Sequence, residues 1–290
     1  MIASLPRAPW LRGATVLYAT LFFAFLFLPL AVVAVFAFND AAYPAPPWRG
    51  FTLDWFTAHG GSGRVGLFAD GELLGSLWTS VVVASWVTLL SVAVGTANAF
   101  VLERAAFRGK AALSLLMLAP LVIPGVILGI SILALASRLA QLADDLFGLE
   151  LAFLRPGLPL VVLGQFSYIV SIATLTIAAR LKRFDATLEE AAFNLGASRT
   201  AVFTTIVLPY LRPALIGAAA ISFLMSFENF NTTLMLVGSD PPLTVMMYGR
   251  MREGATPVLN AVSLFLMVAS AILALTLMRR TGQGHGADRA

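Results

Sequence analysis

The sequence TLEEAAFNLG occupies residues 187–196 and separates two long apolar runs of this 290-residue chain. Thr187 followed three residues later by Glu190 is a capping-box pattern, in which each side chain binds an unpaired backbone N–H at the start of a helix. Gly196 falls where a helix needs a residue in the left-handed conformation to end. The pattern therefore predicts a short helix that begins near Thr187 and ends at Gly196.

A second short helix is predicted directly after the first. Ser198 can cap its start, and it would run through Ile206 towards Pro209, where the chain is reset before the next apolar run. The first helix carries a narrow apolar stripe, which a partner protein could receive in a groove. An interfacial helix–turn–helix that packs only on its own chain is the structural alternative. The stripe consists of Leu188, Ala191, Ala192 and Leu195.

The composition excludes a soluble globular domain. Hydrophobic residues make up 59% of the chain and charged residues 12%, with a mean hydropathy of +0.88. A membrane-spanning helix needs about 20 predominantly apolar residues. The sequence predicts an all-α, polytopic membrane protein, and its six expected spans are 14–38, 76–101, 111–135, 158–179, 213–237 and 257–278.

The distribution of Lys and Arg predicts the orientation of the spans. Most of the 19 basic residues fall in the N-terminus, in segments 102–110 and 180–212, and in the tail. Basic residues are enriched on the cytoplasmic side, so both termini and the 180–212 loop are expected inside. The net charge of +4 follows this topology, and we expect no nucleic-acid partner.

The expected organisation follows from these assignments. A cytoplasmic N-terminus (1–13) and a first span (14–38) precede a periplasmic segment (39–75), in which Gly50–Phe56 is predicted to form a short helix on the outer leaflet. A loop with incidental aromatic residues is the alternative for Gly50–Phe56. A core of five spans (76–278) contains the loop 180–212, and a disordered tail (279–290) ends the chain.

Several local sequences resemble the permease subunits of bacterial type I ABC importers. Glu190-Ala191-Ala192, Gly196 and Ile206-x-Leu208-Pro209 match the EAA loop of that family, and Gly254-x-x-Pro257-x-x-Asn260-Ala261 extends the match. Among these permeases the chain looks most like the spermidine/putrescine group. The resemblance implies a coupling loop that docks on a separate ABC ATPase, with Glu190 as a cap or ion-pair partner and Gly196 as the turn.

The resemblance also implies the partners. They are an ATPase dimer that carries ATP and Mg²⁺, a second permease expected to be a paralogue, a periplasmic solute-binding protein, and the lipid bilayer of the bacterial inner membrane. The chain has no phosphate-cradling G-x-x-x-x-G-K-[ST] sequence, so it is not expected to be an enzyme or to bind a cofactor itself. Cysteine is absent and the two histidines are far apart, so no metal site is expected.

Glu228 is the one ionisable residue within the six expected spans. A charge at a membrane helix centre costs about 2.5–3.5 kcal/mol on insertion scales, so Glu228 should face a water-filled path or another helix. A carboxylate beside aromatic side chains suits an organic cation. We expect the solute pathway to be lined by Glu228, Asn229, Asn231, Thr232, Ser226 and Tyr168. A structural contact between helices is the alternative role for Glu228.

Other functions fit parts of this pattern. The polyamine group suggests a polyamine or similar organic cation, whereas related permeases import a sugar, an amino-acid derivative or an iron complex. An ion-coupled secondary transporter that uses Glu228 is a further alternative. It is disfavoured because the sequence shows no internal repeat and because such a transporter has no use for the capped 180–212 loop.

Overall fold

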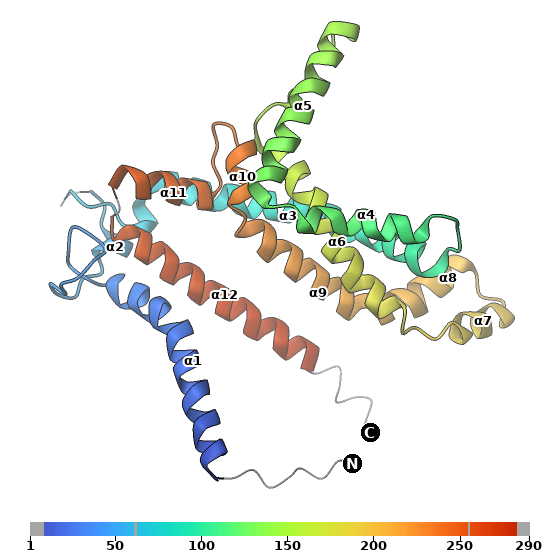
Figure 1. The fold of residues 1–290 in the computed structure, drawn as a ribbon, viewed down its shortest axis with the longest axis horizontal. Coiled ribbons are helices and arrows are strands. Elements are labelled where there is room, and N and C mark those ends of the chain that lie inside the picture. Colours follow the sequence, from blue (N-terminus) through green and yellow to red (C-terminus); the bar gives the residue numbers. More distant parts are fainter. Residues whose placement is uncertain (1–8, 61–62, 255, 283–290) are drawn as a thin grey trace. The chain divides into compact units, whose positions relative to one another are not determined.

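The structure is a computed structural model that describes residues 9–60, 63–254 and 256–282, and it is all-helical, as predicted (Figure 1). Five helices in these ranges are long and apolar enough to cross a membrane. They are α1 (Pro9–Phe36), α3 (Gly71–Arg104), α5 (Gly125–Phe147), α6 (Leu158–Leu181) and the run that ends with α9 (Leu208–Phe227). Helices suit a bilayer because each satisfies its own backbone polar groups.

Shorter elements connect these helices. They are α2 (Asp54–Thr57), η1 (Leu67–Ala69), α4 (Lys110–Val122), η2 (Ala152–Leu154), α7 (Thr187–Asn194), α8 (Arg199–Val202), η3 (Phe203–Val207), α10 (Asn231–Leu236) and α11 (Leu243–Gly254). The last helix, α12 (Val258–Gly282), corresponds to the sixth expected span. The predicted disordered tail lies mostly outside the described residues.

The chain divides into two compact units, residues 1–71 with 249–290 and residues 72–248. In the first unit, α1 packs against α12. The segment before α3 folds around Trp55, whose indole N–H donates to the carbonyl of Asn39 at 2.8 Å. Arg64 covers the Trp55 ring and pairs with Asp40 at 2.6 Å. This segment is therefore an ordered structure held by side-chain contacts.

The helix expected at Gly50–Phe56 is much shorter than predicted. Helix α2 begins only at Asp54, because Phe51 pairs with Asn39 in an isolated antiparallel bridge and holds the chain extended. Trp55 is buried rather than directed outward. The aromatic residues that suggested an interfacial helix are instead partly used to pack this segment on itself.

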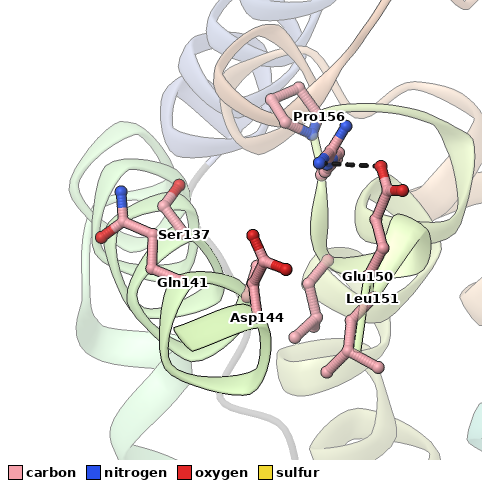
Figure 2. Close-up of a pocket in the computed structure, with 9 residues that line it drawn as sticks. Ser137, Gln141, Asp144, Glu150, Leu151 and Pro156 are labelled. Atoms are coloured by element: carbon pink, nitrogen blue, oxygen red, sulfur yellow. Dashed lines mark ion pairs between the residues drawn. The ribbon is translucent and has the colours of Figure 1, made fainter. Parts of the chain in front are cut away.

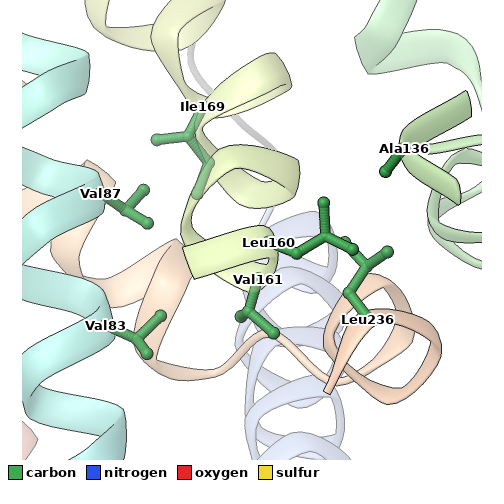
Figure 3. Close-up of a cluster of buried hydrophobic side chains, with 7 residues drawn as sticks. All are labelled: Val83, Val87, Ala136, Leu160, Val161, Ile169 and Leu236. Carbon is green, nitrogen blue, oxygen red and sulfur yellow. The ribbon is translucent and has the colours of Figure 1, made fainter. Parts of the chain in front are cut away.

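In the second unit, α6 is the central helix and lies against α4, α9 and α10. A hydrophobic cluster joins α3, α5, α6 and α10 near the start of α6 (Figure 3); it comprises Val83, Val87, Ala136, Leu160, Val161, Ile169 and Leu236. Farther along α6, the backbones of α3 and α6 approach closely at Gly95. A Cβ added at Gly95 would lie 3.0 Å from the Cβ of Ala173, the close approach that small residues allow between membrane helices.

The third expected span, 111–135, is not one helix. It is divided into α4 and α5, and α5 continues twelve residues past the predicted end, to Phe147. Pro124 lacks a backbone N–H and restricts the residue before it to extended conformations, and Ile123 has φ −76° and ψ 128°. Pro120, Pro124 and Gly125 predict that this span is bent or unwound; in the structure the helix ends before Pro124, while Pro120 lies inside α4.

The fifth expected span, 213–237, is also interrupted. Helix α9 begins earlier, at Leu208, and ends at Phe227, and α10 starts at Asn231. Residues 228–230 form a break between two helices. Glu228 therefore lies at a helix end, not at the centre of a continuous helix as its predicted position implied.

Candidate functional site

The start of the loop helix α7 is capped by a residue that the sequence pattern did not identify. Asp185 Oδ1 accepts the Thr187 backbone N–H at 3.0 Å and the Thr187 hydroxyl at 2.8 Å. The predicted capping box is wrong, because Thr187 lies inside the helix and Glu190 one turn into it. The hydrogen bond from the Thr187 side chain, and then that from its N–H, favour the charged carboxylate and lower the pKa of Asp185.

The end of α7 is the turn that Gly196 predicts. Gly196 has φ +85°, in the left-handed region that glycine adopts without a steric penalty. The Gly196 N–H donates to the Phe193 carbonyl at 2.9 Å, and the Ala197 N–H donates to the Ala192 carbonyl at 3.0 Å. This pair of bonds is a Schellman motif, which satisfies carbonyls left open at the helix end.

The second short helix also begins as predicted. Ser198 Oγ accepts the Ala201 N–H at 3.2 Å. The expected reset at Pro209 does not occur, because α8 passes through the π-helical segment η3 directly into α9. Pro209 lies at the start of α9, directly after the π-helical segment η3. The loop is thus joined to α9 by continuous helix.

The apolar stripe of α7 divides between two surfaces. Leu188 and Ala191 are exposed, and Leu195 is 88% exposed. Ala192 instead packs against the chain's own cluster of Leu181, Phe184, Val202, Val207 and Leu211. Leu188, Ala191 and Leu195 have the i, i+3, i+7 spacing of one helix face, so this exposed face is what α7 offers to another protein.

Glu189, which the sequence reasoning passed over, holds α7 to α3. Arg104 at the end of α3 pairs with Glu189 at 2.5 Å, and the Arg104 guanidinium lies 5.5 Å from the centre of the Phe184 ring. Glu190 is exposed and makes no ion pair among the described residues. The sequence Glu189-Glu190 does not show which of the two carboxylates contacts the rest of the protein, because that depends on where α3 ends.

A second contact joins the C-terminal end of α6 to the N-terminal end of α9. Arg180 lies over the ring of Tyr210 at 4.2 Å, and the Tyr210 ring meets the Phe184 ring edge to face at 5.0 Å. The Arg104–Glu189 pair joins α7 itself to α3, whereas the contacts of Tyr210 join α9 to α6 and to Phe184 in the segment before α7.

The expected pathway residues gather around the break at 228–230. Glu228 and Asn231 are exposed, whereas Ser226 and Thr232 are buried. The Asn229 amide nitrogen donates to the Tyr168 hydroxyl at 2.6 Å, and the Thr232 hydroxyl donates to the Gly125 carbonyl at 3.3 Å. The break thus presents one exposed carboxylate beside polar groups that bind within the chain.

Gln165 joins this cluster in the structural role that its position favours, a hydrogen bond between membrane helices. Its side-chain oxygen accepts the Ser226 hydroxyl, and its amide nitrogen donates to Thr233 Oγ1 at 2.8 Å. Residues 61 and 68 positions away supply these bonds, so no local pattern could reveal them. Three polar residues around Glu228, namely Ser226, Asn229 and Thr233, are therefore anchored to α6.

A polar cavity lies apart from both regions. It has a volume of about 200 Å³ between the end of α5 and the loop that follows it, and Asp144, Ser137 and Gln141 line one wall (Figure 2). Glu150 on the opposite wall pairs with Arg155 at 2.8 Å. None of the expected pathway residues lines this cavity.

This arrangement defines a class of protein. Long apolar helices joined by short connecting elements are the architecture of a polytopic membrane protein. The chain belongs to the family described as the binding-protein-dependent transport system inner membrane component, whose sequence profile matches residues 99–283. It is a multi-pass inner-membrane permease of an ABC importer, in which a separate subunit hydrolyses ATP.

Curated relatives agree with this membership over most of the chain. The chain is 26% identical to the spermidine/putrescine transport system permease protein PotC of Shigella flexneri over 282 residues, which cover 96% of this chain and 97% of PotC. It is 27% identical to the putrescine transport system permease protein PotI of Escherichia coli (strain K12), covering 92% and 89% of the two chains.

A solved structure shares the fold. A chain of a bacterial ABC transporter involved in the import of the acidic polysaccharide alginate superposes with a TM-score of 0.72 and 17% sequence identity, covering 94% of this chain and 96% of that chain. The expected family and the all-helical permease fold are confirmed.

Proposed function

We propose that this permease forms half of the pathway of a polyamine importer, with Glu228 in contact with the cationic solute. The observation that carries the proposal is the exposed carboxylate of Glu228 at the break, beside buried and half-buried polar groups that already have partners. Relatives named for spermidine and putrescine transport support the same class of solute. An organic cation would gain both ion pairing and contact with nearby aromatic rings.

The exposed face of α7 is the second part of the proposal. Leu188, Ala191 and Leu195 would contact an ABC ATPase, with Glu190 at the rim and Gly196 fixing the turn. A dimer of ATPases, a paralogous second permease and a periplasmic binding protein would complete the importer. The Lys and Arg distribution supports a cytoplasmic position for α7 and for both termini.

The solute is tested by replacing the carboxylate of Glu228. Glu228→Gln should lower uptake of labelled putrescine at least tenfold, because the neutral amide cannot pair with an ammonium group, while Glu228→Asp should keep a substantial part of the rate. Both variants should assemble equally well with the ATPase. Unchanged putrescine uptake by Glu228→Gln would remove the residue from the pathway, and uptake of another solute class by the unmodified importer would replace the polyamine.

The partners are tested by purification of the tagged chain from its native membrane in mild detergent. An ATPase and a second permease should co-purify, and their stoichiometry would establish whether the permease pair is identical or paralogous. Leu195→Asp should abolish recovery of the ATPase. Leu175→Asn, at an exposed leucine of α6, is the control for a polar change elsewhere on the surface.

A further inference from the structure

The break between α9 and α10 is connected to α6 by a network of five hydrogen-bonded side chains. Gln165 is at the centre and is 1% exposed, and Thr233 on α10 is fully buried. Buried polar groups of this kind are costly unless each has a partner. All five are satisfied by one another, from Ser226 through Gln165, Thr233 and Asn229 to Tyr168.

The direction of every hydrogen bond in this network of side chains is fixed. Asn229 Oδ1 accepts the backbone N–H of Thr233 at 3.1 Å, so the nitrogen end of the Asn229 amide faces Tyr168. The Thr233 hydroxyl donates to the same oxygen at 2.8 Å, which leaves its own oxygen to accept the Gln165 amide. Gln165 Oε1 then accepts the hydroxyl of Ser226. A single arrangement of donors and acceptors satisfies the set.

This network of side chains fixes the residues on both sides of Glu228. Ser226 precedes it by two residues and Asn229 follows it directly, and each is bound to a residue of α6. The Glu228 carboxylate takes no part in this hydrogen-bonded network and remains exposed. Thr244, at the start of α11, adds a bond to the Asn229 carbonyl at 2.9 Å. The backbone at the break is therefore fixed by side chains, while the carboxylate is left free for a ligand.

We propose that Gln165 and Thr233 are positioning residues for the solute site, which they maintain by fixing the break at Glu228. This inference rests on the proposed function of Glu228. Neither residue touches the solute. Loss of their bonds would let the two helix ends move relative to α6 and would displace the carboxylate.

Thr233→Val and Thr233→Ser are the test pair. Valine keeps the shape of threonine but removes the hydroxyl, so the Gln165 amide and the Asn229 oxygen each lose a partner, whereas serine keeps both bonds. A buried polar group that lacks a partner is destabilising, so we expect Thr233→Val to lower putrescine uptake about tenfold. Thr233→Ser should stay within about twofold of the unmodified importer.

Thr174→Val is the matched control. Thr174 is also buried, on α6, but its hydroxyl donates to the Val170 carbonyl of its own helix at 2.7 Å and takes no part in the side-chain network. Its uptake should be unchanged. An equal loss in Thr174→Val and Thr233→Val would mean a general effect of removing buried hydroxyls and would overturn the positioning role.

A thiol-labelling measurement reports on the break without any solute. The chain contains no cysteine, so Asn231→Cys introduces a single exposed thiol beside the break. Its rate of reaction with a maleimide should change severalfold when Thr233→Val is added to the assembled importer, and should not change with Thr174→Val. An identical rate for Asn231→Cys alone, with Thr233→Val and with Thr174→Val would show that the side-chain network does not set the geometry of the break.

The same assays separate the two hypotheses. Reduced uptake by Glu228→Gln with normal uptake and labelling in Thr233→Val would refute the positioning role and leave the solute site in place. Normal uptake in both variants would refute the solute site as well. If Thr233→Val does not assemble with its partners, Gln165→Met replaces it, because methionine fills a similar volume without either polar group.

Discussion

The loop from Asp185 to Pro209 and the break at residues 228–230 both interrupt the apolar helices, but different contacts hold them. In the loop, each helix end is capped by a residue within four positions of it: Asp185, Gly196 and Ser198. At the break, the bonds connect residues 61 and 68 positions apart. The loop therefore carries its conformation in its own sequence, whereas the break depends on the packed bundle around it.

The largest expected effect comes from breaking the local conformation of the loop. Gly196→Val places a β-branched side chain at φ +85°, where L-residues are strained by about 1–2 kcal/mol. No atom lies within 4 Å of an added Cβ, so the cost is conformational rather than a clash. Uptake should fall at least tenfold while membrane insertion is retained, as measured by transport and by the amount of chain in the membrane.

Gly196→Asn is the control for this substitution, because asparagine tolerates the left-handed conformation better than most residues. It should keep most of the uptake. Equal loss in the two variants would show that a side chain at position 196 blocks the partner surface, and the turn would then not be the critical feature.

A smaller effect is expected at the ion pair that holds α7 to α3. Arg104 and Glu189 are 85 positions apart, and their side chains are 34% and 20% exposed, so the ion pair contributes about 0.2–1 kcal/mol. Arg104→Glu should lower uptake about threefold and reduce the solute moved per ATP hydrolysed. The exchange Arg104→Glu with Glu189→Arg should recover most of the loss, because it restores opposite charges.

Failure of the exchanged pair to recover would locate the role of Arg104 elsewhere, for example in its contact with the Phe184 ring. A recovered rate of uptake with a persistently low ratio of solute to ATP would mean that the pair transmits movement in one orientation only. Either result would sharpen the contrast, since the loop would then share the dependence on distant residues that characterises the break.

The same contrast explains what the sequence could predict. Gly196 and Ser198 were identified because glycine and serine at helix ends act through neighbouring backbone. The span over α6 was also placed correctly, since it is continuous and apolar. The capping box failed because Asp185, two residues earlier, takes both bonds from Thr187. A periodic pattern marks a helix but does not choose between adjacent caps.

Apart from the helix end at Pro124 and the cap at Asp185, which are local, the features that the sequence did not place depend on tertiary contacts. Gln165 resembles any polar residue of a membrane helix until Ser226 and Thr233 are seen to meet it. The polar residues around Glu228 suggest a lining of the pathway, but polar residues occur within continuous membrane helices as well, so the sequence did not reveal the helix break there. Trp55 has the composition signal of an interfacial residue, yet Asn39 supplies an internal acceptor for its N–H. Hydropathy finds apolar segments, whereas their polar residues acquire meaning only from their partners.

The smallest expected effect concerns the cap at Asp185. Its pKa is lowered in the folded chain, so the stabilisation from its charged form is present above the ordinary aspartate pKa of about 3.9 and is lost only as the pH falls through the lower folded value. Asp185→Ala should therefore lower uptake about twofold, equally at every pH from about 5 to 8, while Asp185→Asn, which keeps an acceptor oxygen, should differ little from the unmodified chain. The ratio of the Asp185→Ala rate to the unmodified rate, measured across this pH range, checks the assignment. A ratio that rises towards 1 at pH 5 would mean that Asp185 titrates there, and its pKa would then not be lowered by Thr187.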